Sequence, residues 1–143
     1  YLKAQWQKEL PGLTVSLKAV PTQQIAYQQS AKGNFDVLVS GWGADFNDPI
    51  SFLQIPMTGT SYNYGGYSNK RYDALVKRAN NQDANNPDTR WQDLVNAAKL
   101  LNADQGMTPL YQQVTAYLQR SDVKGIVHNT AGTQWNYKTA YIK

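Results

Sequence analysis

The chain has 143 residues, a formal net charge of +4 and 41% hydrophobic residues, values typical of one ordinary globular domain. No apolar run approaches the roughly 18 residues that cross a bilayer, and the basic residues are scattered, which argues against a membrane span and a nucleic-acid partner. The absence of cysteine excludes disulfides, thiolate metal sites and a cysteine nucleophile.

The chain begins inside a helical pattern, because Leu2, Trp6 and Leu10 share one helix face. Pro11 and Gly12 then break the helix. With neither an initiating Met nor a signal-peptide pattern, the chain is expected to be part of something longer.

The next part has the order strand, helix, strand. Residues 13–20 alternate apolar and polar side chains, residues 22–33 favour a helix that ends at Gly33, and residues 35–40 form a nearly continuous apolar run. This spacing is typical of a βαβ unit, so Leu13–Val20 and Phe35–Ser40 are predicted to be neighbouring parallel strands. The predicted fold class is therefore α/β.

Two amphipathic helices follow, each with apolar residues at i, i+3, i+4 and i+7. The residues are Tyr72, Leu75, Val76 and Ala79 in the first helix, and Trp91, Leu94, Val95 and Ala98 in the second. Ser68 or Asn69 is expected to start the first helix, and Asn86 is expected to cap the second, with Pro87 in its first turn. Residues 110–118 then return to a period of two and are predicted to be a strand.

The stretch GWGADFNDP, which begins at Gly41, collects residues that suit ligand binding. A βαβ strand that runs into such a loop delivers it to the carboxyl edge of the sheet, where open α/β sheets bind ligands. Gly41 and Gly43 allow close backbone approach, and Trp42 offers a flat apolar face. Asp45 and Asp48 add negative charge. The combination suits a cationic, partly apolar small ligand.

Other interpretations of these residues stay open. Trp42 suits a core position, Asp45 a turn, and Asp48 the cap of the short helix PISFLQI. A glycosidase site would need both aspartates turned inward, and a metal site would need a third carboxylate nearby. His128, the single histidine, has no neighbouring Ser or Asp that would complete a triad. No catalytic, metal-binding or cofactor-binding residue is therefore assigned.

Several stretches, taken in order, match one family. They are FDVLVSGWGADFNDPISFL, GYSNKRYDALVKRA, RWQDLVNAAKLLNADQG and TPLYQQVTAYL, followed by VKGI. In this order they resemble the C-terminal region of the oligopeptide-binding (OppA-like) proteins, the extracytoplasmic solute-binding components of peptide ABC importers. The resemblance covers essentially the whole chain. It implies a bilobal, type II periplasmic-binding-protein-like fold, with residues 1–143 as a single domain from the C-terminal lobe.

The resemblance also implies roles for residues of the GWGADFNDP stretch. Asp45 matches the family's aspartate that pairs with the α-ammonium of the peptide. The backbone of Gly41, Trp42 and Gly43 matches the part that hydrogen-bonds the peptide main chain, and the Trp42 ring would wall a side-chain pocket.

Other positions depart from the family pattern. Gln23, Ser30 and Val39 stand where some members carry basic residues or a tryptophan. Tyr111 and Gln113 match ligand-binding positions, but Gln113 stands where an aromatic residue is expected. These departures leave the amino-end anchor intact and put the peptide length and side-chain preference in doubt.

The function implied by the resemblance is non-enzymatic. The protein would bind oligopeptides outside the cytoplasm and deliver them to ABC permease subunits, without a cofactor. The full-length protein would be a monomer, attached to the membrane only through an anchor outside this stretch. Alternatives are the same fold with another solute, such as a dipeptide, a pheromone peptide or a metal chelate, and an aromatic-rich carbohydrate-active or glycan-binding module.

The end of the chain carries a further expectation. In the family the chain crosses back toward the first lobe near its end, so residues 110–143 are expected to be this crossing segment. Orphaned edge strands must be paired or covered. Val123–Lys143 is therefore expected to be poorly packed on its own lobe, mobile, or paired with another copy.

Overall fold

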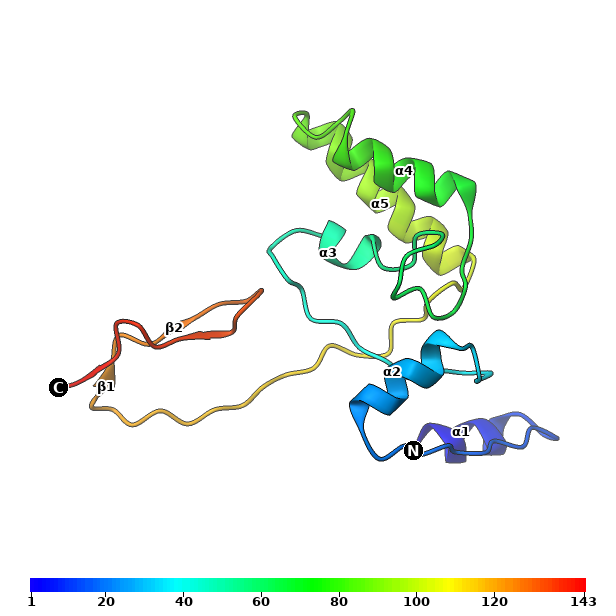
Figure 1. The fold of residues 1–143 in the computed structure, drawn as a ribbon, viewed down its shortest axis with the longest axis horizontal. Helices are drawn as coiled ribbons and strands as arrows, with labels where there is room; N and C mark the ends of the chain where they lie inside the picture. The colour runs from blue at the N-terminus through cyan, green and yellow to red at the C-terminus, as the bar shows by residue number, and fades with distance from the viewer. The chain divides into compact units, whose positions relative to one another are not determined.

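The computed structural model describes residues 1–143 as two units, Tyr1–Asn34 and Phe35–Lys143. In the first unit, α1 spans Leu2–Glu9 and α2 spans Gln23–Ala31 (Figure 1). The helices predicted for the start of the chain and for residues 22–33 are thus confirmed.

The second helix begins and ends where its local sequence indicates. Thr22 Oγ1 accepts a hydrogen bond from the Ile25 N–H at 3.3 Å, which caps the first turn. Gly33 has a φ of +67°, the left-handed conformation that closes many helices.

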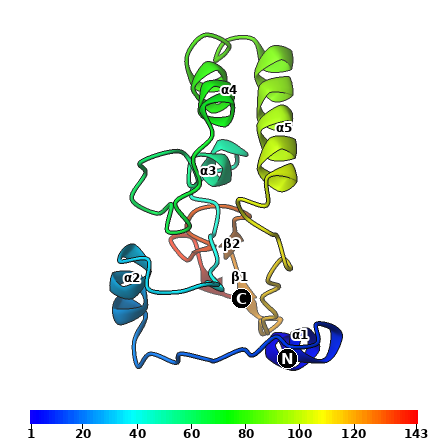
Figure 2. The same cartoon turned by 90° about the vertical axis from the view of Figure 1, so that its right-hand side faces the viewer.

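Three helices form the packed part of the second unit. They are α3 (Ile50–Leu53), α4 (Lys70–Asn80) and α5 (Pro87–Ala103). α4 and α5 lie side by side, and α3 packs against α5 (Figure 1 and Figure 2).

Side-chain caps start both long helices. Asn69 Oδ1 accepts hydrogen bonds from two N–H groups in the first turn of α4, at 2.9 and 3.2 Å. Asn86 Oδ1 accepts one at 3.3 Å at the start of α5, where Pro87 occupies the first turn. The predicted starts are confirmed, with Asn69 rather than Ser68 as the cap of α4.

The core forms where the apolar stripes of α4 and α5 meet α3. Its buried residues are Ile50, Leu53, Tyr72, Val76, Ala79, Leu94, Ala97 and Leu101. The Tyr72 hydroxyl donates to the Leu53 carbonyl oxygen at 2.5 Å, which satisfies the polar end of a fully buried ring. Trp91, predicted on the stripe of α5, is instead 58% exposed, and the buried face of this helix is centred on Leu94 and Ala97.

An ion pair joins α4 to α5 beside this core. Asp93 is buried, and Arg78 donates to both of its oxygens, with 2.6 Å between Nε and Oδ2. The hydrogen bond from Arg78 lowers the pKa of Asp93. A buried carboxylate is tolerated only when it is paired in this way.

The strands lie in the last part of the second unit and pair antiparallel. β1 (Val123–Lys124) pairs with β4 (Tyr141–Ile142), and β2 (Val127–His128) pairs with β3 (Trp135–Asn136). No residue from 123 to 143 is buried, so the expected poor packing of this tail is confirmed. The pairing of the tail with itself is an arrangement that the sequence pattern did not indicate.

The three predicted strands do not form. Residues 13–20, 35–40 and 110–118 are not in strands, and the predicted parallel pairing of the first two is wrong. Val37 and Val39 are 62% and 63% exposed, so the apolar run is not covered on both faces. A strand exists only through hydrogen bonds to a neighbour. The apolar pattern predicts which side chains a sheet would bury, but it does not supply the neighbouring strand.

Candidate functional site

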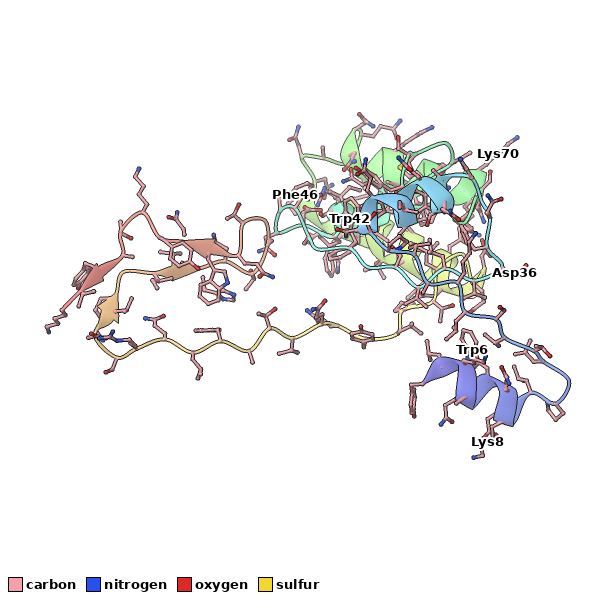
Figure 3. All side chains as sticks on the ribbon, turned by 60° about the horizontal axis from the view of Figure 1, so that its bottom comes forward. Trp6, Lys8, Asp36, Trp42, Phe46 and Lys70 are labelled. Atoms are coloured by element: carbon pink, nitrogen blue, oxygen red, sulfur yellow. The ribbon has the colours of Figure 1, made fainter.

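The stretch that leads into α3 presents unpaired backbone. Residues 41–43 are exposed, and the N–H groups of Gly41, Trp42 and Gly43 make no hydrogen bond within the chain. A Cβ at either glycine would meet nothing within 4 Å, and neither glycine has a positive φ. Open space therefore lies above backbone donors that can pair with an extended ligand. Figure 3 shows Trp42 and Phe46 on this stretch.

Asp45 is held by its backbone and leaves its carboxylate free. Its N–H donates to Ser51 Oγ at 2.8 Å, and Ser51 is fully buried at the start of α3. The Asp45 side chain is exposed and takes part in no ion pair or hydrogen bond. The residue thus offers an unpaired carboxylate on a backbone that is held in place.

Asp48 has a different environment. Its Oδ1 accepts from the Ile50 N–H at 2.9 Å, so Asp48 satisfies the first N–H of α3, as expected for a capping side chain, although Pro49 stands at the N-cap position itself. Arg90 on α5 approaches both oxygens, at 2.9 Å for Nη2–Oδ1 and 2.8 Å for Nη1–Oδ2. These bonds, with the one from Arg90 the largest cause, lower the pKa of Asp48. Both oxygens of the Asp48 carboxylate are therefore engaged in bonds within the chain. Arg90 is a partner that the sequence did not reveal.

Trp42 packs against a loop residue that the sequence analysis did not assign to the site. Its ring lies edge-on to Tyr62, with 4.9 Å between the ring centroids and 60° between the planes. Trp42 is 37% exposed and Tyr62 is 49% exposed, so both rings keep accessible surface. The tryptophan is therefore not a core residue. The only available signal for Tyr62 was the aromatic character of its loop.

The tail also reaches this stretch. The Gly132 N–H donates to the Ala44 carbonyl oxygen at 2.7 Å. A Cβ at Gly132 would lie 2.9 Å from the Asp45 carbonyl oxygen, and the φ of Gly132 is +69°. Glycine is therefore needed where the turn between β2 and β3 approaches the candidate site.

Tyr111 and Gln113 are not brought to this site. Both are exposed, Tyr111 by 81%, and no hydrogen bond or ring contact joins them to residues 41–48. Their ligand-binding role stays a prediction from the resemblance.

The geometry gives the enzymatic interpretations no support. Asp48 is engaged by Arg90, so it is not a free partner for Asp45 in carboxylate-pair chemistry. No group of three or more His, Cys, Asp or Glu side chains is placed to hold a metal ion. His128 packs on Trp135 and Tyr117, with ring centroids 4.5 and 5.9 Å away. The free carboxylate of Asp45, the unpaired N–H groups of residues 41–43 and the exposed Trp42 ring instead lie together on one accessible stretch of chain.

Comparison with known proteins identifies the class of protein to which the chain is similar. No family model matches the chain. It is 36% identical over 144 residues to the dipeptide-binding protein of Lactococcus lactis subsp. cremoris (strain MG1363), a match that covers 100% of this chain and 26% of that protein. The chain is also similar to a solved structure of the pheromone receptor PrgZ, which describes its mode of peptide binding. The two chains are 38% identical with a TM-score of 0.83, and the match covers 99% of this chain and 26% of that chain.

A second solved structure is the substrate-binding domain of an oligopeptide ABC transporter from Bacillus anthracis str. Ames. It has 31% identity and a TM-score of 0.86 over 99% of this chain and 27% of that chain. The chain therefore spans about a quarter of the length of the relatives it matches. No helix is long and apolar enough to span a bilayer.

These findings define the class as an α/β segment of a bilobal substrate-binding protein. The chain is homologous over its whole length to part of the oligopeptide-binding (OppA-like) family of peptide ABC transporters.

Proposed function

We propose that this chain supplies the C-terminal-lobe part of a peptide receptor, and that Asp45 pairs with the α-ammonium group of the bound peptide. The observation that carries the proposal is the contrast between the two aspartates of one stretch. Asp48 is bonded to Arg90, whereas Asp45 is fixed through its backbone and keeps an unpaired carboxylate. A charge-assisted hydrogen bond to an ammonium recognises every free peptide, whatever its side chains.

The neighbouring backbone supports the same orientation. The N–H groups of Gly41, Trp42 and Gly43 are unpaired and uncovered, so an extended peptide can add itself to this segment as a strand would. Main-chain bonds of this kind are independent of sequence. An amino-end anchor followed by main-chain contacts suits a receptor that accepts many peptides.

The wider function follows from the relatives. As part of a substrate-binding protein, the chain would act outside the cytoplasm and present its peptide to the permease subunits of an ABC importer. It would perform no catalysis and need no cofactor. The full-length protein would be monomeric, with any membrane anchor outside residues 1–143. Residues 110–143 would be the part that crosses back to the other lobe.

Calorimetric titration of the natural full-length protein tests the proposal. Three pools are compared: short peptides, the same peptides with acetylated amino ends, and oligosaccharides. Heat of binding is expected with the free peptides and is expected to be strongly reduced with the acetylated ones, because acetylation removes the ammonium charge. Equal binding of both peptide pools would remove Asp45 from its role. Binding of oligosaccharides alone would favour the glycan alternative, which uses Trp42 as a stacking surface.

A further inference from the structure

Residues 58–68 form a surface loop between α3 and α4 that is closed on itself. Thr58 Oγ1 donates to Ser68 Oγ at 3.1 Å, so the two ends of the loop are bonded together. The Thr58 N–H also donates to Asp73 Oδ1 at 3.1 Å, which attaches the loop to α4. A surface loop with adjacent ends is an Ω-loop, a type that frequently carries function. The residues of this Ω-loop include most of the sequence YNYGGYSN.

Asn63 fixes the Ω-loop from inside. Its Nδ2 donates to the carbonyl oxygens of Met57 and Tyr67, at 3.1 and 2.7 Å, and its Oδ1 accepts from the Tyr67 N–H at 3.1 Å. One side chain thus ties the backbone before Tyr62 to the backbone after it. These bonds of the neighbouring residue hold the backbone from which the Tyr62 ring projects.

A second attachment joins the Ω-loop to the end of α5. The Tyr67 hydroxyl donates to Asp104 Oδ2 at 2.8 Å, and the same oxygen accepts from Asn69 Nδ2 at 2.7 Å. The Tyr67 ring lies edge-on to Tyr72 of the core, with 5.4 Å between ring centroids. The loop is thus held at several points by the helices.

The fixed loop places Tyr62 against Trp42. With their planes at 60° and their centroids 4.9 Å apart, the two rings form an aromatic corner, the Trp42–Tyr62 corner, and both rings stay partly exposed. Tyr64 extends it, with its ring centroid 6.3 Å from that of Tyr62. No ion pair involves Trp42, Tyr62 or Asp45. The corner thus presents two partly exposed, uncharged aromatic rings, and one of them, Trp42, stands three positions before Asp45 in the chain.

We propose that Tyr62 is a specificity-determining residue, and that the Trp42–Tyr62 corner receives an apolar side chain near the amino end of the bound peptide. Asn63 is then a positioning residue, because it acts through Tyr62 and does not touch the ligand. The inference rests on the proposed function, since the ammonium pairing of Asp45 decides which end of the peptide lies beside the corner. Aromatic faces carry partial negative charge, so an acidic ligand side chain is disfavoured there.

Substitutions in the natural full-length protein test this role. The probes are tetraglycine and variants that carry Leu, Phe or Asp at the first or the second position. The unaltered protein is expected to favour Leu or Phe over Asp at one of these positions. Tyr62→Ala removes one wall of the corner, and we expect it to reduce the preference by about fivefold to tenfold. Affinity for tetraglycine should stay within about twofold, because the anchor and the backbone contacts are unchanged.

Matched variants separate the flat ring from general damage. Tyr62→Phe keeps the ring and is expected to keep the preference, whereas Tyr62→Leu keeps apolar bulk and is expected to lose the preference for Phe. Asn63→Ala is expected to lower the same preference without changing tetraglycine binding, a selectivity change that simple destabilisation would not give. Melting curves verify that each variant is folded.

The possible failures are distinguishable. Absence of binding for every peptide would overturn the proposed function, and with it this inference. Normal peptide binding with the same side-chain preference in unaltered protein, Tyr62→Ala and Tyr62→Leu would overturn this inference alone. Nuclear Overhauser contacts between a Leu probe and the Tyr62 ring, in the unaltered protein, would support it independently of any variant.

Discussion

Arg90 holds Asp48 by both carboxylate oxygens, although the two residues are 42 positions apart in sequence. The pair connects the first half of α5 to the residues just before α3. It holds the end of the GWGADFNDP stretch against α5 and pairs one of the two negative charges of the stretch with a positive charge. The contrast with Asp45 gives each aspartate a separate, testable role.

The first prediction compares binding by two matched variants. Asp45→Asn should weaken peptide binding by about tenfold to a hundredfold, the usual cost of losing a charge-assisted hydrogen bond. Asp48→Asn should change binding much less, because its side chain contacts Arg90 and Ile50 rather than the ligand. Peptide titrations of both variants measure the difference. Equal losses would show that the ammonium anchor lies elsewhere.

The second prediction concerns stability. Asp48→Asn should lower the free energy of unfolding by about 1 kcal/mol, the upper range for a partly exposed ion pair. The value is modest because the side chains of Arg90 and Asp48 are 22% and 27% exposed. Chemical denaturation of Asp48→Asn, Arg90→Met and the double variant forms a cycle that isolates the pair. Asp36→Asn, at an exposed position, is the control; a coupling energy of zero in the cycle would contradict the prediction.

The third prediction is a loss of stability in acid. Hydrogen bonds from guanidinium groups lower the pKa of Asp48 and Asp93 below the usual 3.8. Such groups bind more protons in the unfolded chain, so their stabilisation is complete above pH 3.8 and is lost as the pH falls through the folded-state pKa. Asp83, whose pKa is raised mainly by burial, acts in the opposite direction.

Melting temperatures measured from pH 6 downward test the assignment of this acid sensitivity. Arg90→Met removes the main cause of the shift at Asp48. This variant should therefore lose less of its melting temperature on acidification than the unaltered protein does. Parallel pH profiles for the two proteins would exclude Asp48 as a source of the effect.

The fourth prediction tests the core. Tyr72→Phe removes the hydroxyl that donates to the buried Leu53 carbonyl and should lower the free energy of unfolding by about 1 kcal/mol. Tyr137→Phe is the matched control, because Tyr137 is 61% exposed. Denaturation curves compare the two variants. A cost at Tyr72 no larger than that at Tyr137 would mean that the buried bond adds no net stability.

The fifth prediction concerns the paired tail. Gly125 has a φ of +71°, and a Cβ there would lie 2.0 Å from the Thr139 carbonyl oxygen. Gly125→Ala should therefore abolish the pairing of β1 with β4, observed as loss of cross-strand nuclear Overhauser contacts between Val123 and Ile142. Gly12→Ala shares the left-handed backbone but meets nothing within 4 Å, so it should leave these contacts intact. Retained contacts in Gly125→Ala would contradict the clash.

The helices could be predicted because their signals are local. Asn69 and Asn86 lie next to the turns that they cap, and the apolar stripe of α4 points to its own buried face. The strand predictions were wrong because they also rested on local patterns, whereas a strand forms only when a distant segment pairs with it. The alternation in residues 13–20 and 110–118 indicates a buried face without indicating which segment supplies the hydrogen bonds.

The residues of the candidate site also fall into those that could be predicted from the sequence and those that could not. The roles expected for Asp45 and Trp42 came from the resemblance of one short stretch to a known family, and the structure leaves both side chains accessible. Arg90 and Tyr62 could not be placed beside this stretch in advance, because only the folded chain brings them there. A distant partner leaves no periodic signal in a single sequence.

The bond from the Asp45 N–H to the buried Ser51 hydroxyl divides the GWGADFNDP stretch into a part with free amides and a part with hydrogen-bonded amides. In hydrogen–deuterium exchange, we expect the amides of Asp45 and Ile50 to open only when the start of α3 loosens, and those of Gly41, Trp42 and Gly43 to exchange freely. An extended peptide that occupies the three free amides would slow their exchange and leave the other two unchanged. The hydrogen-bonded amides of Asp45 and Ile50 thus serve as an internal reference against which the slower exchange of the three free amides reports peptide binding.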